Sequence, residues 1–248
     1  MSIKSANINP FAYQYASLPV INNNEKKTNI FTNKIQTSNF FDNSINTTKP
    51  NSLYLKDDIL AKCLPNSFIA KYLNSGFINK QIQNNPKIQE ILNAKGLAVN
   101  ANLHNVLEII NSHLIPTYTY AKLIMKESGI NFSPEDYTIM EQASLLHDIG
   151  KIFIPAEILN KKENLTQKER EIIGLHDILG VELLKNTQLN PKVLTLIDSH
   201  HKCDGINDNS ILTQILKIAD IYSALKENRS YKMSMNEEDT FKVLFEKW

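Results

Sequence analysis

The feature that most constrains the fold is a series of helix-start signals, each followed by apolar residues at helical spacing. Ser133-Pro134-Glu135-Asp136 combines a capping serine, a proline at the first helical position and acids in the first turn. Thr166 with Glu169 forms a capping-box pattern, and Asn190-Pro191 marks another start. The sequence has no convincing stretches in which apolar and polar residues alternate between hairpin turns, the pattern that would indicate strands. The sequence therefore predicts an all-α fold.

The chain divides by composition into three parts. Residues 1–54 are rich in Asn, Thr, Ser and Lys and bury too little apolar surface to offset the loss of chain entropy, so we expect a disordered tail. Residues 55–100 are expected to form a linker or cap of short helices. Residues 101–248 are expected to form the main helical domain.

The spacing of apolar residues gives the expected helices in more detail. Pro116 is expected to bend or interrupt the long helical segment that begins near Leu103. Asp208-Asn209-Ser210 and Asn236 are expected to precede the last two helices. Beyond the starts at 133, 166 and 190, the expected helical ranges are 57–63, 66–74, 86–94, 103–127, 211–226 and the segment after 236.

Bulk properties exclude several classes of protein. The formal net charge is +1, which lacks the basic excess of a protein that binds nucleic acid polymers. No apolar run approaches the roughly 18 residues of a membrane span, and the N-terminus lacks the apolar core of a signal peptide. Cys63 and Cys203 form no framework spacing, which fits a reducing compartment. We therefore expect a cytoplasmic protein.

Most of the histidines, together with two aspartates, are candidate metal ligands. Of the six histidines, only His104 is expected to have no role. Imidazoles with carboxylates suit ions such as Mn, Fe, Co or Zn, and a pair of such ions can activate water and hold a phosphate ester. Taken singly, each residue has an ordinary explanation, such as a helix-end histidine or a salt-bridged acid. The candidate ligands are His113, His147, Asp148, His176, His200, His201 and Asp220.

The order of these residues resembles the HD-GYP family within the HD superfamily of metal-dependent phosphohydrolases. One segment of this chain resembles the signature of that family: Leu145-Leu146-His147-Asp148-Ile149-Gly150-Lys151-Ile152-Phe153-Ile154-Pro155. Further similar segments are Ile173-Gly174-Leu175-His176, Ser199-His200-His201 with Asp204-Gly205, and Ile218-Ala219-Asp220-Ile221-Tyr222. The resemblance covers roughly residues 103–245 and implies the HD-domain helical bundle.

The resemblance implies a role for each matching residue. Asp148 would bridge two divalent ions, with Fe or Mn as the favoured metals, and Lys151 would stand near the substrate phosphate as a catalytic residue. The substrate would be a cyclic dinucleotide, such as cyclic di-GMP, cleaved by a metal-bridged hydroxide. One ion would be held by His113, His147 and Asp220, and the other by His176, His200 and His201. The candidate substrate-binding residues are Lys151, Lys202, Arg229 and Tyr231.

The sequence also departs from the family pattern. Ile206-Asn207-Asp208 replaces the usual glycine-tyrosine-proline stretch, and Lys202 stands where a glutamate usually follows the paired histidines. Ile109 replaces a glutamate that some members use for a third ion. These departures leave three alternatives open: a hydrolase of another phosphoester, a non-catalytic signalling module that binds a nucleotide or protein partner, and a helical bundle without a site. A signalling partner or a homodimer fits either of the first two alternatives.

Overall fold

The computed structural model describes residues 67–202, 210–227 and 235–246. Every regular element in these ranges is helical, which confirms the all-α prediction. The predicted tail and the helix predicted over 57–63 lie outside the described residues. The division into 1–54, 55–100 and 101–248 stays a prediction. The elements are α2 (Ser67–Ala70), α3 (Ser75–Asn84), α4 (Pro86–Ala94), α5 (His104–Leu107), η2 (Ile110–Leu114), α6 (Ile115–Glu127), α7 (Pro134–Leu146), η3 (Ile149–Phe153), α8 (Ala156–Leu159), α9 (Gln167–Ile173), α10 (Leu175–Leu184), α11 (Pro191–Ser199), α12 (Ile211–Lys226) and α13 (Glu237–Glu246).

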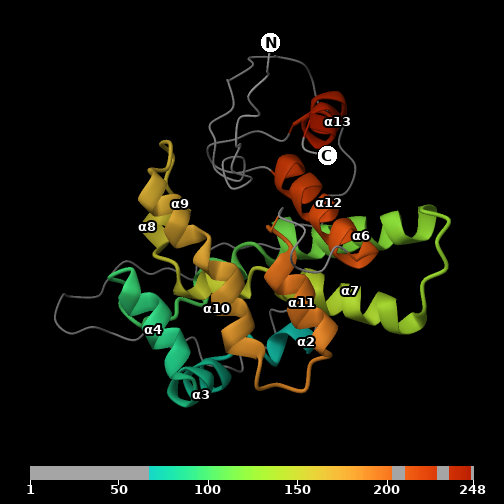
Figure 1. The fold of residues 1–248 in the computed structure, drawn as a ribbon. Coiled ribbons are helices and arrows are strands. Elements are labelled where there is room, and N and C mark those ends of the chain that lie inside the picture. The colour runs from blue at the N-terminus through green and yellow to red at the C-terminus, as the bar shows by residue number, and fades with distance from the viewer. Residues whose placement is uncertain (1–66, 203–209, 228–234, 247–248) are drawn as a thin grey trace, which may run out of the picture.

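The centre of the bundle is built from α6, α7, α10, α11 and α12 (Figure 1). Helix α12 packs against α6 and α7, while α11 packs against α7 and α10. The apolar faces of these helices form one core with fully buried side chains such as Leu114, Met140 and Leu216. Helices from distant parts of the chain therefore meet around one interior.

The helix starts expected from capping residues are confirmed. Ser133 accepts a hydrogen bond from the backbone N–H of Asp136, and the Asp136 carboxylate accepts one from the backbone N–H of Ser133. Thr166 and Glu169 form the same reciprocal pair at α9. Hydrogen bonds from Lys161 and Thr166 lower the pKa of Glu169 to about 2. Capping is local chemistry, so it could be recognised without knowledge of the tertiary structure.

One expectation about helix boundaries was wrong, and another was confirmed. The segment predicted as one helix over 66–74 ends at Ala70, and a separate helix, α3, begins at Ser75 after the capping residue Asn74. The interruption expected at Pro116 in the long segment over 103–127 is present, because a turn of π-helix ends at Leu114 and α6 begins at Ile115. Pro116 lies in the first turn of α6, a position at which a helix tolerates a residue without a backbone N–H.

The N-terminal helices α3 and α4 pack against α10 (Figure 1). Asn85, which caps α4, also donates hydrogen bonds to the backbone carbonyl and the carboxylate of Glu182 in α10. This part of the chain therefore supports the outer face of a helix that carries one of the candidate ligands, His176. Within the described ranges, no helix combines the length and apolar character needed to cross a membrane.

Candidate metal centre

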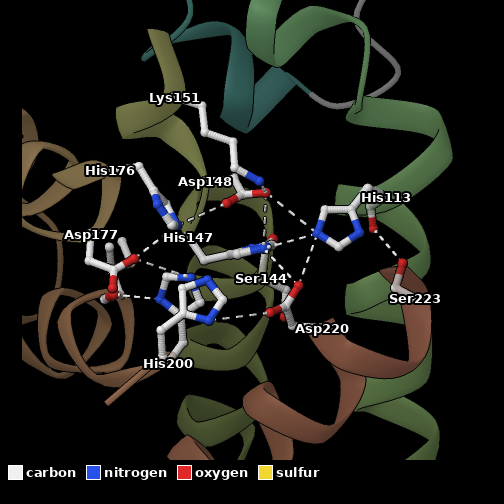
Figure 2. Close-up of polar contacts among 12 residues, drawn as sticks. His113, Ser144, His147, Asp148, Lys151, His176, Asp177, His200, Asp220 and Ser223 are labelled. Atoms are coloured by element: carbon white, nitrogen blue, oxygen red, sulfur yellow. Dashed lines mark hydrogen bonds and ion pairs between the residues drawn. The ribbon is translucent and has the colours of Figure 1, made fainter. Parts of the chain in front are cut away.

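The candidate ligands converge in the interior from helices that are far apart in the chain (Figure 2). All are buried except His201, which is partly exposed. Most lie at helix ends, where the backbone can direct a side chain into the space between neighbouring helices. The elements contribute His113 from η2, His147 and Asp148 from directly after α7, His176 from the start of α10, His200 and His201 from directly after α11, and Asp220 from the middle of α12.

The ligand atoms fall into two groups. In the first, His113, His147 and Asp220 have ligand atoms that all lie within 4.8 Å of one another; we call this the Asp220 group. In the second, the same limit holds for Asp148 with His176, His200 and His201, and we call those three histidines the His176 group. The division matches the two ligand sets that the family resemblance implies.

Asp148 lies between the groups and presents one carboxylate oxygen to each. Its Oδ2 is 3.4 Å from His113 Nε2 and 3.5 Å from His147 Nε2, whereas its Oδ1 is 3.3 Å from His176 Nε2. A carboxylate that directs its two oxygens to two sets of imidazoles has the geometry of a bridging ligand.

The backbone fixes the orientation of three of the rings. His147 Nδ1 lies 2.8 Å from the carbonyl oxygen of Ser144, and the Nδ1 atoms of His176 and His200 lie 2.7 Å and 2.6 Å from the carbonyls of Ile173 and Ile197. A carbonyl oxygen only accepts, so each Nδ1 carries the proton and each neutral ring turns the lone pair of Nε2 inward. This is the tautomer that a ring needs to bind a metal through Nε2.

The centre therefore holds many acceptors and few donors. Within the described residues, His176 Nε2, His200 Nε2 and Asp148 Oδ1 are buried without a hydrogen-bond partner. Uncompensated buried acceptors are costly, and those facing one another also repel. A proton or a cation among them removes this cost. Because the donors are imidazoles and carboxylates, the set fits divalent ions such as Mn, Fe, Co or Zn.

The pKa values in the centre follow from the same crowding. Burial opposes ionisation of Asp148, but Lys151 and the surrounding histidines outweigh it and hold the pKa of this carboxyl well below its usual range. Burial likewise opposes ionisation of Asp220, and the His113 and His147 rings, whose Nε2 atoms lie 3.0 Å and 3.5 Å from Asp220 Oδ1, keep the pKa of this carboxyl well below the usual range. The two carboxylates are thus ionised, as metal ligands must be.

The pKa values of His200 and His147, one histidine from each group, shift in opposite directions. Burial lowers the pKa of His200, and the neighbouring His201 lowers it further, so it stays well below the ordinary value. For His147, burial also lowers the pKa, but Asp148 and Asp220 outweigh it and raise the net value. The neutral form of His200, which can bind a metal, is therefore favoured, whereas the carboxylates beside His147 favour its protonated form, with which a cation would compete.

Gly150 lies in η3, which begins directly after Asp148, and contacts the backbone of α10. A Cβ at this position would collide with the backbone carbonyl of His176 and would lie 2.7 Å from the backbone nitrogen of Gly180. Only glycine allows η3 to approach α10 this closely. The turn that carries Asp148 is therefore held directly against the helix that carries His176.

Lys151 lies beside Asp148, with its Nζ 2.6 Å from Asp148 Oδ2. The turn that carries it is held by Asn105, whose side-chain amide donates to the backbone carbonyls of Lys151 and Ile154 at 2.9 Å and 2.8 Å. Both side chains are buried. A cation is thus fixed at the edge of the ligand cluster, where it can stabilise negative charge on a phosphate.

The other candidate residues lie elsewhere or outside the described ranges. Lys202 pairs with Asp198, at 2.7 Å, on the partly exposed end of α11. Arg229 and Tyr231, and the stretch that replaces the glycine-tyrosine-proline motif, are outside the described residues. His104 lies on the exposed surface and pairs with Glu108 at 2.8 Å, away from the cluster.

Sequence reasoning missed Asp177. This aspartate follows His176 in the first turn of α10 and is buried, with its carboxylate directed at His176 and His200 (Figure 2). An acid in the first turn of a helix is ordinarily explained by the helix dipole, so Asp177 was not among the predicted site residues. The available signal was the repetition of a His-Asp pair, because His147-Asp148 and His176-Asp177 have the same order.

Comparisons with known proteins agree with this geometry. Residues 97–225 match the HD domain. The chain is 34% identical over 140 residues to the cyclic di-GMP phosphodiesterase PdeB of Borreliella burgdorferi, a match that covers 51% of this chain and 36% of the relative. It is 32% identical over 123 residues to the cyclic di-GMP phosphodiesterase response regulator RpfG of Xanthomonas campestris pv. campestris, covering 45% and 32%.

A third relative carries a different substrate in its name. The 3'3'-cGAMP-specific phosphodiesterase 2 of Vibrio cholerae is 32% identical over 152 residues, which cover 55% of this chain and 29% of that protein. The matches thus span about a third of the length of these relatives. The domain match over residues 97–225 includes the histidines and aspartates that converge. With the domain match extending over more than half of its residues, the chain belongs to the HD domain family.

Proposed function

We propose that this chain is a metal-dependent phosphodiesterase that hydrolyses a cyclic dinucleotide, either cyclic di-GMP or a related one. The observation that carries the proposal is the position of Asp148, whose two oxygens face two separate sets of imidazoles. Paired divalent ions are a recurrent means of cleaving phosphate esters. A buried pair of ligand sets joined by one carboxylate is suited to hold them.

In this proposal, Asp148 is shared by two ions, with Fe or Mn as the favoured metals. His113, His147 and Asp220 are the ligands of one ion, and His176, His200 and His201 are ligands of the other. The facing lone pairs of His176 and His200 support the assignment, because a cation relieves their repulsion. When bound, such ions polarise the phosphoryl oxygen and acidify water.

The chain's own residues hold and neutralise the substrate. The Lys151 ammonium, fixed by Asp148 and by the turn that Asn105 holds, is placed to balance charge on a phosphate. We include Lys202, Arg229 and Tyr231 as substrate contacts. Hydrolysis adds water across a phosphodiester bond and opens the ring to a linear dinucleotide, or proceeds to mononucleotides.

The relatives support this substrate class, since two of them are named for cyclic di-GMP and one for 3'3'-cGAMP. Because the matches cover about a third of those proteins, the substrate is proposed from the shared HD domain alone. We also propose that the chain acts in the cytoplasm and that a signalling protein or a second copy of the chain is its partner.

The test is a hydrolysis assay on the purified chain loaded with Mn²⁺ or Fe²⁺. We expect metal-dependent turnover of cyclic di-GMP or 3'3'-cGAMP, followed by chromatography of the products. Loss of turnover after chelation, and its return on adding metal, would support the proposal. A metal-loaded chain that cleaves neither dinucleotide contradicts the substrate assignment. A chain that binds no metal under reducing conditions contradicts the enzymatic assignment and favours a signalling module.

A further inference from the structure

We propose that Asp177 is an additional ligand of the ion bound by the His176 group, an inference that rests on the proposed metal pair. The Oδ1 atom of Asp177 lies 2.9 Å from His176 Nε2 and 3.6 Å from His200 Nε2. Both of these nitrogens face the centre. The carboxylate of Asp177 is therefore on the metal side of the rings.

These distances are those expected between neighbouring ligands of one ion. Ligand atoms about 2.1 Å from a metal and roughly at right angles to each other are about 3 Å apart. The candidate ligand pairs His113 Nε2–Asp220 Oδ1, at 3.0 Å, and His176 Nε2–Asp148 Oδ1, at 3.3 Å, have similar separations. Asp177 thus has the same spatial relation to His176 as Asp220 has to His113.

Asp177 does not have the position of a residue that only orients an imidazole. An orienting carboxylate accepts a hydrogen bond from the ring nitrogen that faces away from the metal. In His176 and His200, that nitrogen is Nδ1, and it already donates to the carbonyls of Ile173 and Ile197. The carboxylate instead approaches Nε2, where two acceptors meet unless a proton or a cation lies between them.

The burial of Asp177 strengthens this argument. The side chain is 4% exposed, and within the described residues its Oδ1 has no hydrogen-bond partner. A buried carboxylate oxygen is costly unless it is paired or coordinates a metal. Three neutral imidazoles supply no negative charge of their own, so Asp177 would give the His176 group the charge that Asp220 gives its own group.

Metal titration of the full chain tests the proposal without reference to activity. The metal-free protein is titrated with Mn²⁺, and bound ion is counted by equilibrium dialysis and followed by electron paramagnetic resonance. We expect Asp177→Asn to weaken binding of one ion at least tenfold and to leave the other unchanged. Glu182→Gln is the matched control, because Glu182 lies on the same helix but contacts Asn85 and Lys185 instead. This variant is expected to bind both ions with wild-type affinity.

A second variant tests directly whether the side chain at position 177 lies in the coordination sphere of the ion. With Co²⁺ bound, Asp177→Cys is expected to show a thiolate-to-cobalt charge-transfer band that is missing from the wild type and from Glu182→Cys. This variant decides the question if Asp177→Asn fails to fold, as judged by circular dichroism. Folded, cobalt-loaded Asp177→Cys without the band overturns the proposal, as does Asp177→Asn with unchanged affinity for both ions.

The outcomes separate this inference from the proposed function. Loss of one ion in Asp177→Asn, in a protein whose wild type cleaves no cyclic dinucleotide, supports the ligand and contradicts the substrate. Unchanged metal binding by Asp177→Asn, in a wild type that hydrolyses the substrate, contradicts the ligand alone. A wild-type chain that binds no Mn²⁺ overturns both.

Discussion

The two ligand groups differ in how the chain builds them. The Asp220 group takes its residues from η2, α7 and α12, so it exists only when α12 docks on the helices around η2. The His176 group comes from α10 and the end of α11, two helices that follow each other in the chain and pack together. One group therefore depends on long-range assembly and the other on a single helix pair. This difference predicts that substitutions can disable the groups separately.

Asp148 is the one candidate ligand that both groups share, so its loss should weaken metal binding by both groups at once. We expect Asp148→Asn to bind neither ion tightly and to lose activity by at least about a thousandfold, since bound metal contributes several kcal/mol to catalysis. Elemental analysis and the hydrolysis assay measure this. Glu90→Gln, an exposed acid paired with Lys87, is the control. Near-normal activity in Asp148→Asn would remove the basis of the site assignment.

Asp220→Asn should separate the groups. The substitution removes the charge that faces His113 and His147 but leaves the His176 group intact. We expect affinity for one ion to fall by about a hundredfold, at the upper end of what perturbing metal-site residues costs, while the other ion stays bound. Titration with Mn²⁺ measures the affinity of each of the two ions. If both ions were lost together, the groups would be one cooperative site rather than two.

Gly150→Ala should strain the junction between the groups. The added methyl group collides with the backbone of α10, which cannot move as a flexible side chain can. We expect the free energy of unfolding of the metal-free protein to fall by about 1–3 kcal/mol, the usual cost of overpacking. Denaturant unfolding measures this change.

The matched control for that substitution is Gly76→Ala in α3. A Cβ there would meet only the side chain of Asn74, at 3.5 Å, and alanine favours the helix. We expect no loss of stability in this control. Equal destabilisation by the two substitutions would mean that the close approach of η3 to α10 has no special cost.

Ser223→Ala should have a smaller effect than the substitutions of Asp148, Asp220 and Gly150, and it should act on one group. Ser223 donates a 3.1 Å hydrogen bond to the backbone carbonyl of His113 and so ties α12 to the turn that carries this ligand. Its loss is expected to cost about 1 kcal/mol of stability and to weaken the Asp220 group a few-fold. Thermal unfolding and Mn²⁺ titration measure the two effects.

Ser199→Ala is the parallel change beside the His176 group. Within the described residues, the Ser199 hydroxyl is buried without a hydrogen-bond partner, so its removal breaks no bond. We expect the His176 group to keep its metal affinity. A larger effect here than in Ser223→Ala would show that the His176 group depends on its surroundings more than its local construction suggests.

Local chemistry explains which parts of the fold could be predicted. The starts of α7, α9, α11 and α12 were recognised because a cap and its partner lie within a few residues of each other. Helix α3 was missed because its sequence has few apolar residues, of which Ile78 is buried. This helix packs against α10, and such tertiary packing, rather than a regular spacing of apolar residues, stabilises it.

The sequence by itself determined the helical class, the helix starts and the identity of the histidines and aspartates, because each of these depends on residues close together in the chain. Only the tertiary structure decided that Asp148 faces both groups, that Asp177 lies beside His200 and that Gly150 contacts α10. These are distances of a few Å between elements separated in sequence. They arise from how helices pack, which no local pattern of residues specifies.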